Sequence, residues 1–157
     1  MKAIASFTID HDILQKGMYV SRVDEDITTY DIRMVRPNCG NYIANAALHT
    51  FEHLFATYVR NSRFASHIIY VGPMGCRTGF YLLTRNLPKA DVIALVQESF
   101  AFIAAFEGQI PGAQYSRECG NYKEHDLPAA KQVAADMRVV LKNWTIDMLD
   151  YNYHTQK

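Results

Sequence analysis

The sequence has no excess of charge of either sign and no long apolar run. Its 157 residues contain 16 lysines and arginines against 16 aspartates and glutamates, so the formal net charge is zero. A general nucleic-acid-binding protein normally carries a basic excess that neutralises phosphates, so this class is excluded. The longest apolar runs, near residues 92–96 and 100–106, fall far short of the roughly 18 residues that a membrane-spanning helix requires. We therefore expect neither nucleic acid nor a membrane as a partner.

Cysteine is scarce as well. Three cysteines, Cys39, Cys76 and Cys119, are an odd number in a chain of this length, which argues against a disulfide framework. The N-terminal stretch is charged at Lys2 and again within its first 12 residues, which leaves too little apolar sequence for a secretory signal. We therefore expect a cytoplasmic protein whose thiols are free for metal binding or chemistry.

Apolar side chains, by contrast, are plentiful. Hydrophobic residues make up 49% of the chain and charged residues 20%, a composition typical of a folded domain with a core. No internal repeat, low-complexity tract or linker divides the sequence. We expect a single domain over residues 1–157, with residues 146–157 as a loosely held tail.

The apolar pattern predicts strands in groups and helices between and after them. Five segments have strand character: residues 6–10, 18–24, 28–35, 67–71 and 77–84. Three segments have helical character: residues 44–60, residues 88–107, and a last helix capped by Asp126 with Pro128 in its first turn. Because the strands do not alternate with helices one by one, the order predicts an α+β fold, a mostly antiparallel sheet with helices packed on one face.

The first predicted helix carries three residues with catalytic chemistry. On a helical wheel His53 lies about 40° from His49, and Glu52 lies about 60° away on the other side. Histidines four residues apart on one face can coordinate a single metal ion. Glu52 lies between the imidazoles and the apolar stripe, where partial loss of water suits a general base. The spacing alone also arises by chance in a chain with six histidines, so a metal site requires a third ligand.

Two residues compete for the place of the third ligand. Cys119 lies in a loop before the last helix, next to Gly120, which leaves its thiolate accessible. Two histidines and one cysteine leave a fourth position for water or substrate, which is typical of a catalytic metal site. His125 directly precedes the cap of the last helix, where a local hydrogen bond also explains it. The chemistry favours Cys119.

Cys76 lies in a different setting, the glycine-rich turn over residues 72–79. Arg77 and the backbone N–H groups of such a turn favour the thiolate form, so Cys76 is a candidate catalytic thiol. The competing interpretation is a buried cysteine that acts as a small apolar side chain. Cys39 lies in a turn without an evident partner, and we assign it no role.

Several short motifs follow one another between about residue 6 and residue 144. They are SFTIDH from Ser6, DIR from Asp31, HTFEH from His49, PMGCRTGFY from Pro73, ECG from Glu118 and HDL from His125. HTFEH alone is a weak signal, whereas PMGCRTGFY together with the later CG is a strong one. This combination resembles the S-ribosylhomocysteine lyase (LuxS) family.

The resemblance implies a homodimer with two active sites at the subunit interface, each built from both chains. It implies one ferrous ion per subunit, with zinc or cobalt as other occupants, held by His49, His53 and Cys119. The implied reaction cleaves the thioether of S-ribosyl-L-homocysteine to L-homocysteine and 4,5-dihydroxypentane-2,3-dione. The second product is the precursor of autoinducer-2, a quorum-sensing signal, and the first returns to the methyl cycle.

The implied reaction explains these residue types. The thiolate leaves by β-elimination only after two carbonyl shifts have placed a ketone at C3, and a Lewis acid stabilises the charge that develops. The resemblance assigns Cys76 and Glu52 as the groups that move protons. Ser6, His11 and Arg33 match positions that hold the substrate or assist proton transfer, and Arg33 also favours the Cys76 thiolate.

The sequence departs from the family pattern at one position, and it leaves two alternative functions open. Tyr70 stands where relatives often have an acidic residue that binds the homocysteine amino group. An HxxEH-type metallopeptidase would need Glu107 as its third ligand. A non-enzymatic metal-binding protein would need a closed site, with His125 as the fourth ligand.

Overall fold

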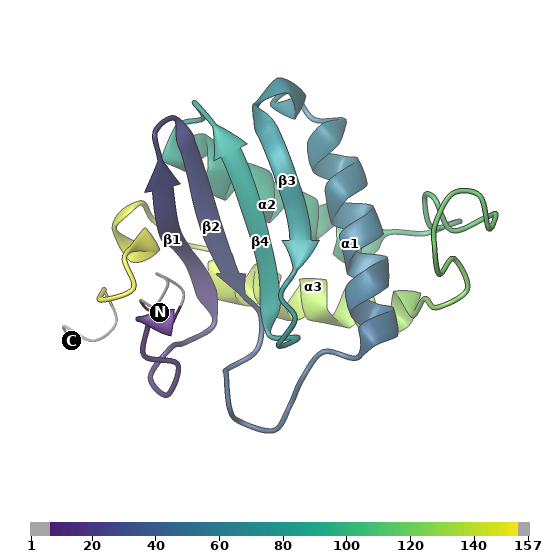
Figure 1. Ribbon diagram of the computed structural model, residues 1–157, viewed down its shortest axis with the longest axis horizontal. Helices are drawn as coiled ribbons and strands as arrows, with labels where there is room; N and C mark the ends of the chain where they lie inside the picture. Colours follow the sequence, from purple (N-terminus) through teal and green to yellow (C-terminus); the bar gives the residue numbers. More distant parts are fainter. Residues whose placement is uncertain (1–6, 154–157) are drawn as a thin grey trace, which may run out of the picture.

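The computed structural model describes residues 7–153, which form a four-stranded antiparallel sheet with helices on one face (Figure 1). The strand order across the sheet is β1-β2-β4-β3. The strands are β1 (Gly17–Asp24), β2 (Ile27–Arg33), β3 (Ile68–Pro73) and β4 (Gly79–Arg85). The helices are α1 (Asn45–Arg60), α2 (Lys89–Ala105) and α3 (Leu127–Leu141), with short 3-10 turns η2 (Ala65–His67) and η3 (Asp147–Leu149). The predicted α+β fold is confirmed.

Alternation along the strands separates two faces of the sheet. Tyr30 and Ile32 of β2 pair in register with Leu82 and Phe80 of β4, and all four are buried in the core with the helices. Successive side chains of a strand point to opposite faces, so Asp31 points away from the helices. We call this second face the outer face.

α1 packs an apolar stripe against the sheet and α2. The rings of Phe51 and Phe55 contact those of Phe80 in β4 and Phe100 in α2, at centroid distances of 5.1 to 6.3 Å. Beside this stripe lie three half-buried polar side chains: His49, Glu52 and His53. None of the described helices is long and apolar enough to cross a membrane.

α3 begins at the predicted cap. A carboxylate oxygen of Asp126 accepts a hydrogen bond from the backbone N–H of Ala129 (3.0 Å), with Pro128 in the first turn. The backbone N–H of Asp126 donates to the hydroxyl of Thr50 in α1 (2.9 Å). The start of α3 is thereby fixed against α1, which places the preceding residue, His125, beside the predicted metal site.

The strand predicted over residues 6–10 is wrong for the described residues 7–10. Residues 7–13 form short turns, in which the Asp12 N–H donates to an Asp10 carboxylate oxygen (3.0 Å) and His11 Nδ1 bonds the Ile9 carbonyl (2.8 Å). Such local bonds between side chains and backbone compete with a strand ladder. Ser6 lies outside the described residues. The other predicted strands and helices, for which we gave both ends, begin and end within two residues of the observed ones.

The segment that we expected to be a loose tail is packed on the sheet as far as it is described. Leu149 in η3 is only 2% exposed. The ring of Tyr151 stacks on that of Tyr19 in β1, with centroids 4.8 Å apart and 18° between the planes. Burial of this leucine and of the aromatic pair anchors the segment. The sequence does not predict this packing, because Leu149 lies in a mostly polar stretch.

The N-terminal and C-terminal segments both lie over the outer face beside β1 (Figure 1). Together they line a pocket of about 470 Å³, to which Ile9 and Gln15 contribute from one side and Tyr151 from the other. Asp31 and Arg33 are therefore only 1% and 2% exposed, although none of the helices α1, α2 and α3 covers this face.

Candidate functional site

α1 presents two histidines one helical turn apart. The centroids of the His49 and His53 rings are 4.6 Å apart, edge to face. His49 Nδ1 lies 2.9 Å from the carbonyl oxygen of Glu124, and His53 Nδ1 lies 2.6 Å from that of Pro111. A carbonyl oxygen only accepts, so each Nδ1 carries a proton, and in the neutral imidazole the lone pair is then on Nε2. Both imidazoles are therefore oriented to bind a metal ion through Nε2.

The loop between α2 and α3 passes close to these rings. Gly112 adopts a φ of +70°, and a Cβ there would lie 3.3 Å from His53 Nδ1. Glycine tolerates both this backbone conformation and this close approach. The loop can therefore deliver the Pro111 carbonyl to His53.

His125 completes a group of three imidazoles. Its Nδ1 lies 3.1 Å from the hydroxyl of Thr50, whose single proton is donated to the Ala46 carbonyl (2.9 Å). His125 Nδ1 must therefore be the donor to Thr50, which leaves Nε2 unprotonated. That Nε2 is buried and has no hydrogen-bond partner among the described residues. The ring stacks on His49 at a centroid distance of 4.2 Å.

The pKa of His125 is lowered from its usual value. Burial is the largest cause, because it penalises the charged imidazolium; repulsion from His49 and His53 adds to it, and Glu124 acts in the opposite direction. His125 therefore favours the neutral form, which offers a lone pair to a metal ion.

The donor atoms of this cluster fit a divalent metal ion. One ring nitrogen from each of His49, His53 and His125 lies within 4.8 Å of the other two. Cys119 Sγ lies 3.2 Å from His49 Nε2 and accepts a hydrogen bond from the Asn121 N–H (3.4 Å). Imidazole nitrogen and thiolate sulfur are ligands that iron, cobalt and zinc accept. We call these four residues the donor cluster.

The sequence favoured Cys119 over His125. The structure groups His125 with both histidines of α1, whereas it places Cys119 Sγ against His49 alone of the two. Glu52, on the same helix, is half-buried, and its carboxylate makes no hydrogen bond or ion pair within residues 7–153. Its position leaves the carboxylate available to a bound molecule.

Cys76 lies in the turn between β3 and β4. The turn is held by hydrogen bonds from the Met74 N–H to the Gly79 carbonyl and from the Arg77 N–H to the Met74 carbonyl, each 2.9 Å. A Cβ at Gly79 would collide with the carbonyl oxygen of Ile32, so only glycine allows this approach to β2. Cys76 is an exposed free thiol, so the alternative of a buried apolar role is wrong.

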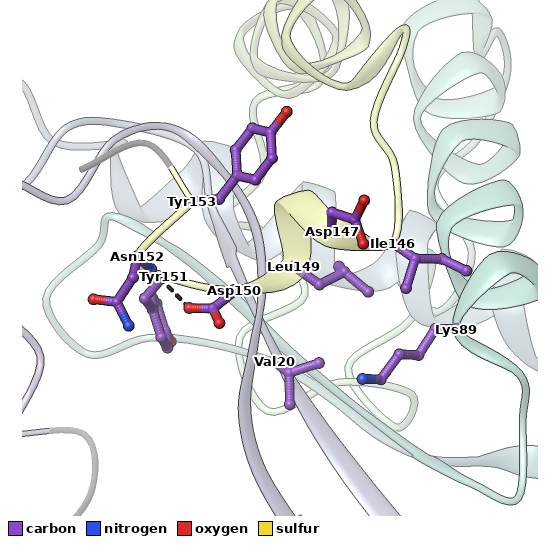
Figure 2. Close-up of a pocket in the computed structure, with 9 residues that line it drawn as sticks. All are labelled: Val20, Lys89, Ile146, Asp147, Leu149, Asp150, Tyr151, Asn152 and Tyr153. Carbon is purple, nitrogen blue, oxygen red and sulfur yellow. Dashed lines mark hydrogen bonds between the residues drawn. The ribbon is translucent and has the colours of Figure 1, made fainter. Parts of the chain in front are cut away.

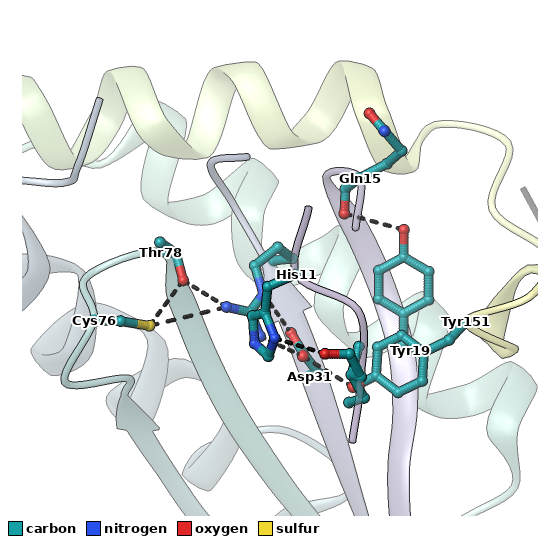
Figure 3. Close-up of polar contacts among 9 residues, drawn as sticks. His11, Gln15, Tyr19, Asp31, Cys76, Thr78 and Tyr151 are labelled. Atoms are coloured by element: carbon teal, nitrogen blue, oxygen red, sulfur yellow. Dashed lines mark hydrogen bonds and ion pairs between the residues drawn. The ribbon is translucent and has the colours of Figure 1, made fainter. Parts of the chain in front are cut away.

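Arg33 lies beside this thiol, whose contact with the Thr78 hydroxyl is drawn in Figure 3. Cys76 Sγ is 3.9 Å from Arg33 Nη1 and 3.0 Å from the hydroxyl of Thr78, which accepts a hydrogen bond from the same Nη1 (2.6 Å). The other side of the guanidinium forms a two-point ion pair with Asp31, at 2.6 and 3.1 Å. Burial alone would lower the pKa of Arg33, but Asp31, with smaller contributions from Cys76 and Tyr151, raises the pKa above its usual value. Arg33 is thus a permanent cation beside Cys76.

Cys76 opens into a pocket of about 790 Å³, which we call the thiol pocket. It is lined by His11, Arg33, Tyr42, Cys76 and Tyr81 among other residues. Because His11 Nδ1 donates to the Ile9 carbonyl, its Nε2 keeps a lone pair. None of the donor cluster or Glu52 lines this pocket. The two predicted halves of the site therefore do not share this cavity within one chain.

A further pocket, of about 640 Å³, lies between the C-terminal segment and the start of α2 (Figure 2). Lys89, Asp147 and Asp150 contribute its charges. None of the predicted site residues between 7 and 153 lines it.

Sequence reasoning gave no role to three residues of this arrangement: Asp31, Thr78 and Tyr151. Asp31 and Arg33 are two residues apart on a strand and hence on one face, a signal that could have found their ion pair. Thr78 lies within the PMGCRTGFY motif. Nothing in the sequence marks Tyr151, whose hydroxyl donates to Asp31 (2.9 Å).

Comparison with known proteins gives consistent matches. The sequence profile of a family described as S-ribosylhomocysteinase (LuxS) matches residues 4–147. The S-ribosylhomocysteine lyase of Phocaeicola vulgatus is 51% identical over 158 residues, which cover 96% of this chain and 98% of the relative. Those of Clostridium acetobutylicum and Borreliella burgdorferi are 45% and 47% identical, each over 96% of this chain and 99% of the relative.

Proposed function

Because the chain belongs to the S-ribosylhomocysteine lyase (LuxS) family, we propose that it is a carbon–sulfur lyase that cleaves S-ribosyl-L-homocysteine. The products are L-homocysteine and 4,5-dihydroxypentane-2,3-dione, the precursor of autoinducer-2. The observation that carries the proposal is the pairing, in one chain, of the donor cluster with an exposed cysteine beside a buried arginine. Relatives of the same name cover nearly the whole chain.

The reaction moves protons and breaks one carbon–sulfur bond. The carbonyl of the sugar moves from C1 to C2 and then to C3, which makes the hydrogen on C4 acidic. Loss of that proton breaks the C5–S bond, and the electron pair leaves with sulfur, which takes up a proton to give homocysteine. No water, oxidant or reductant is consumed. The protein must therefore supply proton carriers and stabilise negative charge on oxygen.

We propose that His49, His53 and Cys119 hold one divalent metal ion per subunit, with iron as the native metal and zinc or cobalt as other occupants. When bound, such an ion supplies Lewis acidity for negative charge on the substrate oxygens. The carbonyls of Glu124 and Pro111 fix both imidazoles, which keeps their Nε2 atoms in place. Three protein ligands leave a position open for substrate.

Cys76 and Glu52 are the proposed proton carriers. The Arg33 cation and the Thr78 hydroxyl lie beside Cys76 Sγ, so a charged and a polar group adjoin this proposed proton carrier. Glu52 is half-buried, with no partner among the described residues to compete for its carboxylate. Two carriers with separate approaches to the substrate satisfy a reaction that needs protons both removed and returned.

His11, Ser6 and Arg33 form the proposed wall of the substrate site. His11 lines the thiol pocket, with the lone pair of its Nε2 available. Arg33 is committed to Asp31 and Thr78, so we propose that it acts mainly by holding Cys76. The role proposed for Ser6 rests on the family motif alone.

We propose that the complete site forms between two chains. The thiol pocket contains Cys76 without any residue of the donor cluster, which supports a site in which a second chain supplies the other half. The outer face near β3 exposes Tyr70 (51%), and Tyr42 beside the thiol pocket is 43% exposed, which suits burial against a partner. All three cysteines are free thiols, in keeping with a cytoplasmic location.

The discriminating experiment measures homocysteine release from S-ribosylhomocysteine by the metal-loaded chain under anaerobic conditions, with proteolysis of an unfolded protein measured in parallel. Thiol release without proteolysis supports the proposal, and proteolysis alone overturns it. The metallopeptidase is disfavoured already, because Glu107 is exposed beyond the end of α2 and lies outside the donor cluster.

A closed metal site without enzymatic activity is the second candidate, and one observation favours it. His125 Nε2 is buried, unpartnered among the described residues and grouped with the other two imidazoles. A fourth protein ligand would leave no position for substrate. In that case the metal-loaded chain releases no homocysteine.

A further inference from the structure

The C-terminal segment reaches the surroundings of Cys76 through a single hydroxyl group. The hydroxyl of Tyr151 donates to Asp31 Oδ2 (2.9 Å), the same oxygen that pairs with Arg33 Nη2 (2.6 Å). Arg33 Nη1 in turn contacts Thr78 and Cys76. Tyr151, Asp31, Arg33 and Cys76 thus form a continuous series of polar contacts across the outer face (Figure 3).

Asp31 needs more than one donor to remain in place. Its carboxylate is 1% exposed, so water cannot satisfy its oxygens. Arg33 occupies one position on each oxygen, and Tyr151 supplies a further donor to Oδ2. Loss of that donor would leave the Arg33 ion pair without the third bond that fixes Oδ2, so the carboxylate and the guanidinium would shift together.

Tyr151 is itself held in one orientation. Its ring stacks on Tyr19, while Leu149, two residues earlier, is buried. Burial raises the pKa of the Tyr151 hydroxyl, and the Asp31 carboxylate raises it further, so the group remains a proton donor over the whole working range of pH. The donor role is therefore permanent.

We propose that Tyr151 is a positioning residue for the thiol of Cys76: its hydroxyl fixes the Asp31 carboxylate, which holds the Arg33 guanidinium against Thr78 and Cys76. This inference rests on the proposed function for the part played by Cys76 in turnover. Tyr151 does not line the thiol pocket, so it acts through Arg33 and not on the substrate.

Other charged and titratable groups also face Cys76. Arg33 does so from β2, His11 from the N-terminal segment, Arg77 from the turn itself and Tyr81 from β4. Within residues 7–153, none of these groups is hydrogen-bonded to Tyr151; Arg33 is linked to it only through Asp31. Of these four groups, only Arg33 should therefore change its contact with Cys76 when the Tyr151 hydroxyl is removed.

The test compares Tyr151→Phe with Tyr19→Phe in the full, metal-loaded chain. Tyr151→Phe keeps the stacked ring and removes only the hydroxyl that reaches Asp31. Tyr19→Phe removes the neighbouring hydroxyl, which donates to the Gln15 carbonyl (3.1 Å) and not to Asp31. Alkylation of each cysteine by iodoacetamide at pH 7, resolved by mass spectrometry, gives the Cys76 rate relative to exposed Cys39 as internal reference.

We expect Tyr151→Phe to lower the Cys76-to-Cys39 rate ratio about three- to tenfold, the factor that loss of one hydrogen bond produces. We expect kcat to fall by a similar factor, with KM and metal content unchanged. Tyr19→Phe should leave the ratio as in the wild type. An unchanged ratio in Tyr151→Phe, or an equal loss in both variants, would overturn the proposal.

A third variant, Tyr151→Leu, separates the hydroxyl from packing. If the hydroxyl acts as proposed, Tyr151→Leu and Tyr151→Phe show the same low Cys76-to-Cys39 rate ratio. If the ratio is low in Tyr151→Leu but at the wild-type value in Tyr151→Phe, the ring acts by packing and the proposal is rejected. Failure of the proposed function gives a different result. A wild-type chain that releases no homocysteine rejects the lyase, while the alkylation ratio still decides the role of Tyr151.

Discussion

At the scale of single residues, Cys76 and Cys119 differ in what their sulfur atoms touch. Cys119 Sγ lies against the Nε2 of His49, and Cys76 Sγ lies against the guanidinium of Arg33. A thiol next to an unprotonated imidazole can share a metal ion with it, whereas a thiol next to a cation is stabilised as a thiolate. The same residue type therefore has two proposed tasks.

Substitution of each cysteine by alanine should separate the two tasks. Cys119→Ala removes a proposed ligand, so metal content and homocysteine release should fall together. Cys76→Ala removes no proposed ligand, so the variant should bind metal normally and lose turnover. Cys76→Asp should keep a trace of turnover, because a carboxylate is a proton carrier of similar reach. Metal analysis together with the thiol-release assay checks this, and metal lost from Cys76→Ala but kept by Cys119→Ala would contradict both assignments.

Glu52 is the second residue-scale case. Glu52→Gln keeps the shape of the side chain and removes its ability to exchange a proton. Turnover should fall about 10²-fold or more, the usual scale for a general acid or base, while metal content stays at the wild-type level. Near-normal turnover, measured as homocysteine release at saturating substrate, would show that the carboxylate has no catalytic task.

At the scale of elements, the sequence was most informative where one helix or turn contains the whole signal. The apolar stripe of α1 and the cap of α3 are local patterns, and both elements formed as predicted. The residue 6–10 prediction failed because Asp10 and His11 bond the adjacent backbone, an alternative that an apolar alternation does not exclude. The contact of Tyr151 with Asp31 joins residues 120 positions apart, which no local pattern contains.

The start of α3 decides whether the donor cluster is open or closed. His125 is fixed there by Thr50 and by the cap at Asp126. If the site is open, His125→Gln should keep its metal and lose only part of its activity, because three ligands remain. If metal analysis shows that His125→Gln loses its metal as Cys119→Ala does, His125 is a fourth ligand and the closed site is correct.

At the scale of the whole molecule, the separation of the thiol pocket from the donor cluster predicts complementation between inactive chains. A dimer of Cys76→Ala with Cys119→Ala has one site with both defects and one site with neither, provided that each site takes its halves from different chains. Random assortment makes half of the dimers mixed, so turnover should recover to at most about a quarter of the wild-type value.

The check is to refold the two inactive variants together and to compare thiol release with that of each variant refolded alone. Light scattering on the same samples reports the dimer. Absence of recovery in a mixed dimer would place both halves of the site in one chain, and a fully active monomer would remove the interface altogether.

The long reach of the Tyr151 contact also bears on how the chain acquires its structure. Closing a loop of 120 residues carries a large entropic cost, so a contact of this kind forms after local hairpins and helices. During synthesis from the N-terminus, β2 is made long before Tyr151 exists to cover it. The ion pair of Asp31 and Arg33 is therefore exposed to water until Tyr151 packs over it. The surroundings of the reactive thiol are then among the last parts of the fold to form.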